Sequence, residues 1–139
     1  MQAVLNDLLP SQNMFYAIKV EGTFAYIKTR SVQKQTEPYP PLVEVTSAQT
    51  VFEFNDVEGT LVGFWCPEYS DGINLPGYHL HFISDDFTMG GHLLECSMKA
   101  GTILIDTTTE YHMLLPENEH FAQTNFNSVP EEDKQKAEK

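Results

Sequence analysis

Residues 77–83 read Gly-Tyr-His-Leu-His-Phe-Ile, and with Gly-Gly-His at 90–92 they decide the fold. Polar and apolar side chains alternate through residues 79–82, as in a β-strand with one buried face. Side chains two positions apart share a face, so His79 and His81 point together while the leucine and phenylalanine pack on the opposite side. A turn at 84–86 would bring the next strand alongside. The sequence therefore predicts that His92 lies beside the first two histidines.

Three imidazoles converging from two strands form a suitable ligand set for zinc, with positions left open for water or substrate. Neutral imidazole also binds copper, nickel and iron, so the pattern alone does not fix the metal. A single histidine in a sheet is more often a structural residue, and an HxH pair alone is a weak signal. The third histidine strengthens the prediction, and the double glycine before it favours a bulge that would aim His92. We expect the other two histidines, His112 and His120, to be structural or surface residues.

The flanking sequence predicts further strands. Residues 15–20 and 23–30 indicate a hairpin with its turn at Glu21-Gly22. Other short alternating or apolar runs predict strands at 52–54, 59–65, 91–98, 101–107 and 111–115. Three prolines within residues 36–42 exclude a central strand or a helix interior there, and a helical turn is expected near Ser47.

These elements predict a mainly β, α+β fold. We expect an antiparallel sheet or partly open barrel that carries the three-histidine site, with a short C-terminal helix. That helix is placed at residues 131–139, where acidic residues precede basic ones and so complement the helix dipole. The length of 139 residues suits a single domain spanning residues 1–139.

The charge balance excludes several partners. Eight basic and 20 acidic residues give a net charge of −12, which disfavours DNA, RNA and anionic membrane surfaces. An anionic substrate would be repelled by the overall field, so a metal or a well-placed arginine would have to attract it. The chain lacks an apolar run of the roughly 18 residues that a membrane span needs. Its first residues do not resemble a signal peptide, and we expect a soluble, cytoplasmic protein.

Other motifs narrow the chemistry. The sequence contains no GxSxG, P-loop or GxGxxG pattern, so serine hydrolase, nucleoside triphosphatase and dinucleotide-binding functions have no support. Cys66 and Cys96 do not form a CxxC pair, and we expect buried thiols rather than a disulfide. Arg30, at the end of a predicted strand, would ordinarily be a surface charge. If it points into the metal site, it could bind a carboxylate in a bidentate manner.

Residues 77–82 and 90–92 are similar to the zinc-binding signature of α-acetolactate decarboxylases. The flanking segments agree with this family: Asn-Met-Phe-Tyr-Ala-Ile at 13–18, Lys-Thr-Arg at 28–30, Gly-Thr-Leu-Val-Gly-Phe at 59–64 and Pro-Glu-Tyr at 67–69. The resemblance covers almost the entire chain, so it is far more specific than the HxH pair.

The resemblance implies an enzyme that converts the small molecule acetolactate to acetoin and CO2. His79, His81 and His92 would be the zinc ligands, with zinc acting as a Lewis acid on the substrate oxygens. Arg30 would match the family's active-site arginine, a fixed cation that stabilises the enediolate. Glu138 would match an active-site glutamate near the family's C-terminus.

Family members are longer and carry an N-terminal lobe that supplies a further active-site glutamate. We therefore expect this chain to correspond to the C-terminal lobe, either as a homodimer or paired with such an N-terminal lobe. An alternative is a non-catalytic metal-binding half of the enzyme. A cupin-like metalloenzyme is a further alternative, because His79, His81 and Asp85 loosely match a cupin motif, although His92 follows too closely for the second motif.

Overall fold

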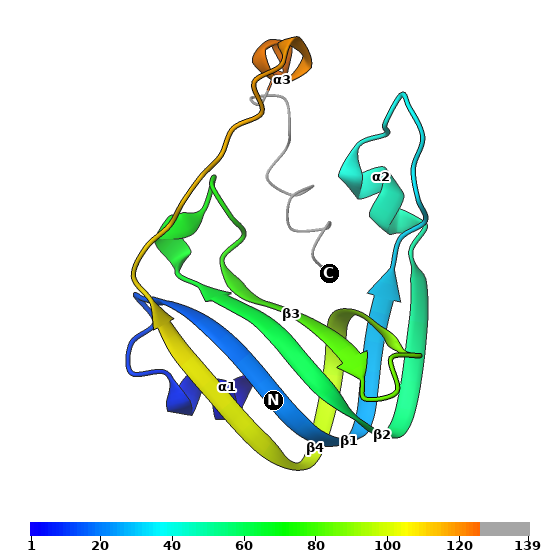
Figure 1. Cartoon of the computed structure of the whole chain (residues 1–139), viewed down its shortest axis with the longest axis vertical. Coiled ribbons are helices and arrows are strands. Elements are labelled where there is room, and N and C mark those ends of the chain that lie inside the picture. The colour runs from blue at the N-terminus through cyan, green and yellow to red at the C-terminus, as the bar shows by residue number, and fades with distance from the viewer. Residues whose placement is uncertain (126–139) are drawn as a thin grey trace.

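A computed structural model describes residues 1–125, and a four-stranded antiparallel sheet dominates it (Figure 1). Helix α1 (Gln2–Leu8) precedes strand β1 (Phe15–Ser31), and helix α2 (Leu42–Ser47) precedes strand β2 (Thr50–Cys66). The remaining elements are the 3-10 helix η1 (Glu68–Ser70), β3 (Gly77–Ser84), β4 (Gly90–Thr108) and α3 (Glu119–Gln123). The prediction of a mainly β, α+β fold is confirmed. No helix among residues 1–125 is long and apolar enough to cross a membrane.

The sheet closes on itself, but unevenly. β1 pairs with both β2 and β4 along almost its whole length. β2 continues the sheet by pairing residues 59–66 with all of β3. Only three residue pairs, at 81–83 of β3 and 90–92 of β4, complete the ring. The result is an antiparallel barrel with one short seam, in agreement with the expected sheet or partly open barrel.

The predicted hairpin at residues 15–30 is wrong, because β1 runs straight through Glu21-Gly22. Gly22 instead lies opposite Gly59 on one side and Gly101 on the other. A Cβ atom at Gly22 would stand 2.2 Å from the backbone oxygen of Ala100, so no side chain fits there. The glycine therefore permits the close approach of the neighbouring backbones.

Two other predicted breaks are also absent. Residues 52–54 and 59–65 belong to the single strand β2, and residues 91–98 and 101–107 belong to β4. The predicted strand at 111–115 does not form, and its side chains are exposed. The ladder between β4 and β1 ends at the pair Thr108–Phe15, where β1 begins, so the later residues have no strand to join.

The remaining expectations on local structure have mixed outcomes. The helical turn near Ser47 is confirmed as α2, and residues 36–40 form no helix or strand. Cys66 and Cys96 are free thiols; Cys66 is buried and Cys96 partly buried. The C-terminal helix predicted at 131–139 lies outside the described residues.

The hydrophobic core lies on one face of the sheet and is completed by α1. Cross-strand rows such as Val20–Leu61–Phe82 place apolar residues of three strands side by side on this face. Leu5 of α1 is fully buried among them. Because strand side chains alternate, the residues between these core positions project from the opposite face, where the histidines lie.

We predict that Gly22→Ala destabilises the fold by at least about 2 kcal/mol, because the added methyl collides with backbone rather than with a movable side chain. Urea unfolding measured by circular dichroism tests this. The neighbouring Glu21→Ala removes only an exposed ion pair with Lys19 (2.6 Å) and should change stability by less than about 1 kcal/mol. Equal effects of the two substitutions would contradict the close-approach role of Gly22.

Candidate metal centre

The core holds β3 in the orientation that presents the first two histidines. Leu80 and Phe82 are 5% and 3% exposed and face the core. The Phe82 ring packs edge-on against Phe24, with ring centroids 5.7 Å apart. A strand anchored in this way cannot rotate without losing its buried side chains. His79 and His81 are therefore fixed on the opposite face, as the alternating sequence predicts.

The connection between β3 and β4 is a compact turn ordered by one carboxylate. The Asp86 Oδ1 atom accepts hydrogen bonds from Ser84 Oγ (2.6 Å), Thr88 N (3.0 Å) and Thr88 Oγ1 (2.7 Å). These hydrogen bonds lower the pKa of the Asp86 carboxyl below its ordinary value, the one donated by Ser84 most strongly and those donated by Thr88 less. The Ser84 amide also donates to the carbonyl of Met89 (2.9 Å). This network sets the register in which β4 returns.

That register places His92 directly opposite His81. Thr29 on β1 donates from Oγ1 to the carbonyl of Gly90 (3.2 Å) and so fixes the start of β4. Gly91 has φ +140°, and a Cβ there would lie 2.7 Å from the Arg30 carbonyl oxygen, so this position requires glycine. The double glycine does not form the expected bulge against β3. The irregularity lies instead between β1 and β4, where the register shifts between Lys28 and Thr29.

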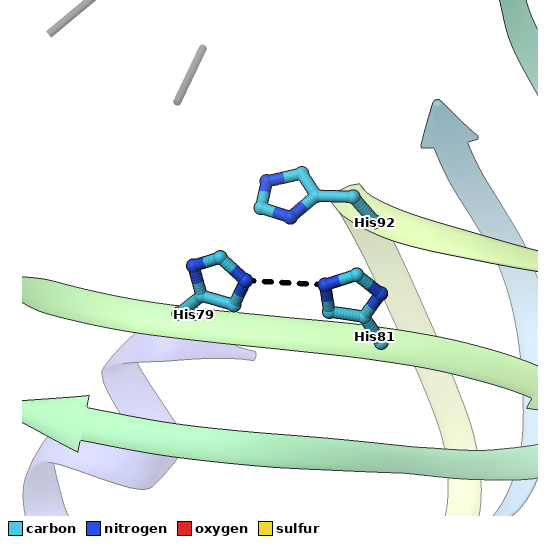
Figure 2. A group of neighbouring side chains, drawn as sticks. All are labelled: His79, His81 and His92. Carbon is cyan, nitrogen blue, oxygen red and sulfur yellow. Dashed lines mark hydrogen bonds between the residues drawn. The ribbon is translucent and has the colours of Figure 1, made fainter. Parts of the chain in front are cut away.

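The three histidines meet as predicted (Figure 2). Their candidate ligand nitrogens all lie within 4.8 Å of one another. His79 Nε2 and His81 Nε2 are 3.1 Å apart. Two nitrogens bound to one tetrahedral zinc ion are separated by roughly 3.3 Å. The three imidazole donors and this spacing therefore fit a zinc ion.

Arg30 belongs to the same surface as the histidines. It pairs directly with His92 of β4, and residues directly opposite each other in a sheet share a face. The structure thus aligns Arg30, His92 and His81 in one row across three strands. Arg30 is 7% exposed, which is unusual for an arginine. Its Nη1 donates to Gln49 Oε1 at 3.1 Å.

Sequence reasoning did not identify Gln49. Nothing in its local pattern distinguishes it from a loop glutamine, because its relevance arises only from the contact with Arg30 across 19 positions of sequence. Glu138, the predicted active-site glutamate, lies outside the described residues. Asp85, the third residue of the cupin-like pattern, is not part of the ligand group found among residues 1–125. His112 and His120 are exposed, as expected.

Apolar side chains extend the histidine face across the sheet. Phe64 lies opposite His79, and Val62 lies opposite His81. Leu104 lies further along the same row, because Lys19 of β1 pairs with Val62 on one side and with Leu104 on the other. Val62, Phe64 and Leu104 are each about half exposed, at 51%, 52% and 51%. The histidines therefore have half-exposed apolar side chains of β2 as their direct neighbours in the sheet.

Comparison with known proteins shows the family of this chain. The family model for alpha-acetolactate decarboxylase matches residues 1–128. The chain is 48% identical over 131 residues to an alpha-acetolactate decarboxylase from Methanosarcina mazei, covering 94% of this chain and 46% of that protein. It is 43% identical over 123 residues to an alpha-acetolactate decarboxylase from Bacillus licheniformis, covering 88% of this chain and 49% of that protein.

The solved structures agree. The crystal structure of alpha-acetolactate decarboxylase from Bacillus subtilis strain 168 superimposes with a TM-score of 0.92 at 37% identity, covering 99% of this chain and 59% of that chain. The chain spans about half the length of the curated relatives it matches.

We predict that the chain binds zinc and that His81→Ala weakens binding by at least about 100-fold, because it removes one of three ligands. Isothermal titration with competing chelator measures the affinity. Zinc at 100 times its dissociation constant should also stabilise the wild type by about 2.7 kcal/mol. The matched control is His112→Ala, at an exposed histidine whose recorded partner is Glu110. Equal affinities in the two variants would contradict the site.

We also predict that Asp86→Ala destabilises the β3–β4 turn at pH 7, and that its deficit shrinks in acid. The folded-state pKa of Asp86 is depressed, so its stabilisation is present above the unfolded pKa and is lost as pH falls through the folded value. Urea unfolding of both proteins between pH 7 and pH 2 would show the curves converging. A deficit that is independent of pH would mean that the carboxylate charge is not its source.

Proposed function

Because this chain belongs to the alpha-acetolactate decarboxylase family, we propose that it carries the metal centre for decarboxylation of 2-acetolactate to acetoin and CO2. The observation that carries this proposal is the row formed by His81, His92 and the buried Arg30, with His79 completing the ligand set. The row brings a site for a divalent cation and a permanent organic cation to one face of the sheet.

The chemistry requires positive charge. Acetolactate is a β-keto acid, and breaking its bond to the carboxylate releases CO2 and leaves the electron pair delocalised toward the ketone oxygen as an enediolate. Protonation at carbon then gives acetoin. In water the separated negative charge is poorly stabilised, so preorganised cations at the developing charge lower the barrier.

The residues present fit a zinc cofactor. His79, His81 and His92 would hold the ion through neutral imidazole nitrogens. Zinc, when bound, supplies Lewis-acid polarisation of the substrate's hydroxyl and carbonyl oxygens.

Arg30 would supply the second cation. Its guanidinium is charged at any physiological pH, and its planar donors match a carboxylate or a pair of substrate oxygens. Because the side chain is largely buried, its field is screened less than that of a surface arginine. Glu138 is included in the proposal as an active-site carboxylate.

A second proposal concerns what else this site needs. The chain spans about half the length of its curated relatives, and apolar side chains on its histidine face are half exposed. A homodimer, or pairing with a lobe equivalent to the rest of the relatives' length, would cover them. If such a partner is indispensable, the chain alone is a metal-binding half without turnover.

We predict that the zinc-loaded chain, alone or supplied with the missing portion of a relative, forms acetoin from racemic acetolactate. Arg30→Lys should lower kcat/KM by roughly 100-fold, because lysine keeps the charge but loses the planar pair of donors. Acetoin is quantified colorimetrically, with His81→Ala as the metal-site variant. Lys28→Ala is the matched control, since Lys28 lies two residues earlier on β1 and pairs with Glu53 at 3.8 Å.

The outcomes separate the alternatives. Turnover by the chain alone that His81→Ala abolishes would establish an autonomous decarboxylase. Turnover only after addition of the portion of a relative that this chain does not span would establish that the site needs a partner. If neither preparation forms acetoin while zinc still binds, the site is non-catalytic and the proposed function is wrong.

A further inference from the structure

We infer that Thr29 is a positioning residue for the metal centre, because its buried hydroxyl holds the start of β4 where the backbone brings His92 to the other two histidines. The inference rests on the metal site of the proposed function and adds a residue outside the ligand set. Thr29 is fully buried, and its Oγ1 donates to the carbonyl of Gly90 at 3.2 Å. Gly90 lies two residues before His92 on the same strand.

The start of β4 is separated by a bulge from the long ladder that the rest of the strand forms with β1. Lys28 of β1 pairs with Glu95, whereas the next residue, Thr29, pairs with Leu93, so β4 carries one extra residue between these pairs. Beyond the bulge, just one more residue pair of the described chain joins β4 to β1. A bulge disrupts the ladder locally. The long ladder therefore does not dictate the position of residues 90–93.

The other side of this segment is held by an equally short ladder. Three residue pairs join it to β3 within the described chain, and two of them contain Gly90 and Gly91. Two successive glycines leave the backbone flexible and provide no side chain that could anchor it. Thr29 meets this need, since its hydroxyl binds the Gly90 carbonyl. A Cβ at Gly91 would lie 3.1 Å from the Thr29 Cβ and 3.2 Å from its Oγ1, so Thr29 packs closely against both glycines.

Metal binding is sensitive to the position of this segment. Tetrahedral zinc takes histidine nitrogens at about 2.0–2.1 Å, so its ligands must reach fixed points in space. His81 on β3 and His92 on β4 form one residue pair across the seam, and a displacement of β4 changes the distance between them. Thr29 acts on the backbone and so supplements whatever contacts the imidazoles make themselves. Loss of its hydroxyl should weaken metal binding without removing a ligand.

Two substitutions separate the hydroxyl of Thr29 from its methyl group. Thr29→Val keeps the shape and removes the donor, so zinc affinity should fall by about 10-fold. Thr29→Ser keeps the donor and removes a buried methyl, so zinc affinity should stay within about twofold of wild type while the urea midpoint falls. A merely structural role would instead make zinc affinity follow stability in both variants.

The matched control is Thr46→Val, in helix α2, which contains no histidine. Thr46 is also buried, and its Oγ1 donates to a backbone carbonyl, that of Val43, at the same distance of 3.2 Å. The control therefore removes an equivalent hydrogen bond from another element of the fold. Its zinc affinity should equal that of wild type.

Spectroscopy and hydrogen exchange provide readouts of position. The visible absorption of bound Co²⁺ reports the geometry of its ligands, so the spectrum should change in Thr29→Val and match wild type in Thr29→Ser. In the metal-free protein, hydrogen exchange followed by mass spectrometry should be faster at residues 89–93 in Thr29→Val and unchanged at residues 59–66. In a His92→Ala background, Thr29→Val should cause no further loss of zinc affinity.

The outcomes separate this inference from the proposed function. Zinc affinity at the wild-type level in Thr29→Val, a loss that serine does not rescue, or additive losses with His92→Ala would overturn the role of Thr29. If the wild type binds neither zinc nor cobalt, the metal centre itself is wrong and the inference fails with it. Because no readout depends on turnover, a chain that binds zinc without decarboxylating acetolactate still decides whether Thr29 positions His92.

Discussion

The short ladder between β3 and β4 is the constraint on which the metal centre depends. Its three residue pairs close the barrel, and one of them is His81–His92, so closure of the sheet and assembly of the ligand set are the same event. The ladder is too short to hold by itself, and its register is reinforced from both ends. The turn ordered by Asp86 fixes which residue of β4 lies opposite each residue of β3. The hydrogen bond from Thr29 to the Gly90 carbonyl fixes the start of β4 against β1. The ligands therefore come from strands whose relative position is decided by many residues that never touch the metal.

The second determinant is the division of the sheet into two faces. Leu80 and Phe82 are tied into the core, and this burial dictates that the histidines between and beside them face the other way. The cost of rotating β3 would be the exposure of two large apolar side chains, each worth about 2 kcal/mol or more. The orientation of the histidines is thus stabilised by hydrophobic burial on the opposite face of the strand.

The sequence predicts local chemistry better than it predicts strand lengths. The grouping of the three histidines could be predicted because it follows from the alternation around His79 and His81 and the turn before His92. Strand periodicity and a tight turn are local properties of the sequence. Gly22 was interpreted as a turn because glycine favours turns, whereas its role is to let three strands approach closely, which depends on partners at Gly59 and Gly101. Arg30 was identified through family resemblance, and its burial could not be foreseen, since it depends on its two neighbouring strands. The contact with Gln49 is equally non-local.

The acidic charge of the chain makes local positive charge necessary at the proposed site. A net charge of −12 repels an anionic substrate at long range, and at physiological ionic strength that repulsion is screened beyond about 8 Å. Within that distance the local cations decide. Zinc would be held by neutral imidazoles, which leave its full charge in place, and the largely buried Arg30 lies in the same row of the sheet. In an acidic protein, a ligand set of neutral imidazoles preserves the positive charge of the metal ion where negative charge would develop.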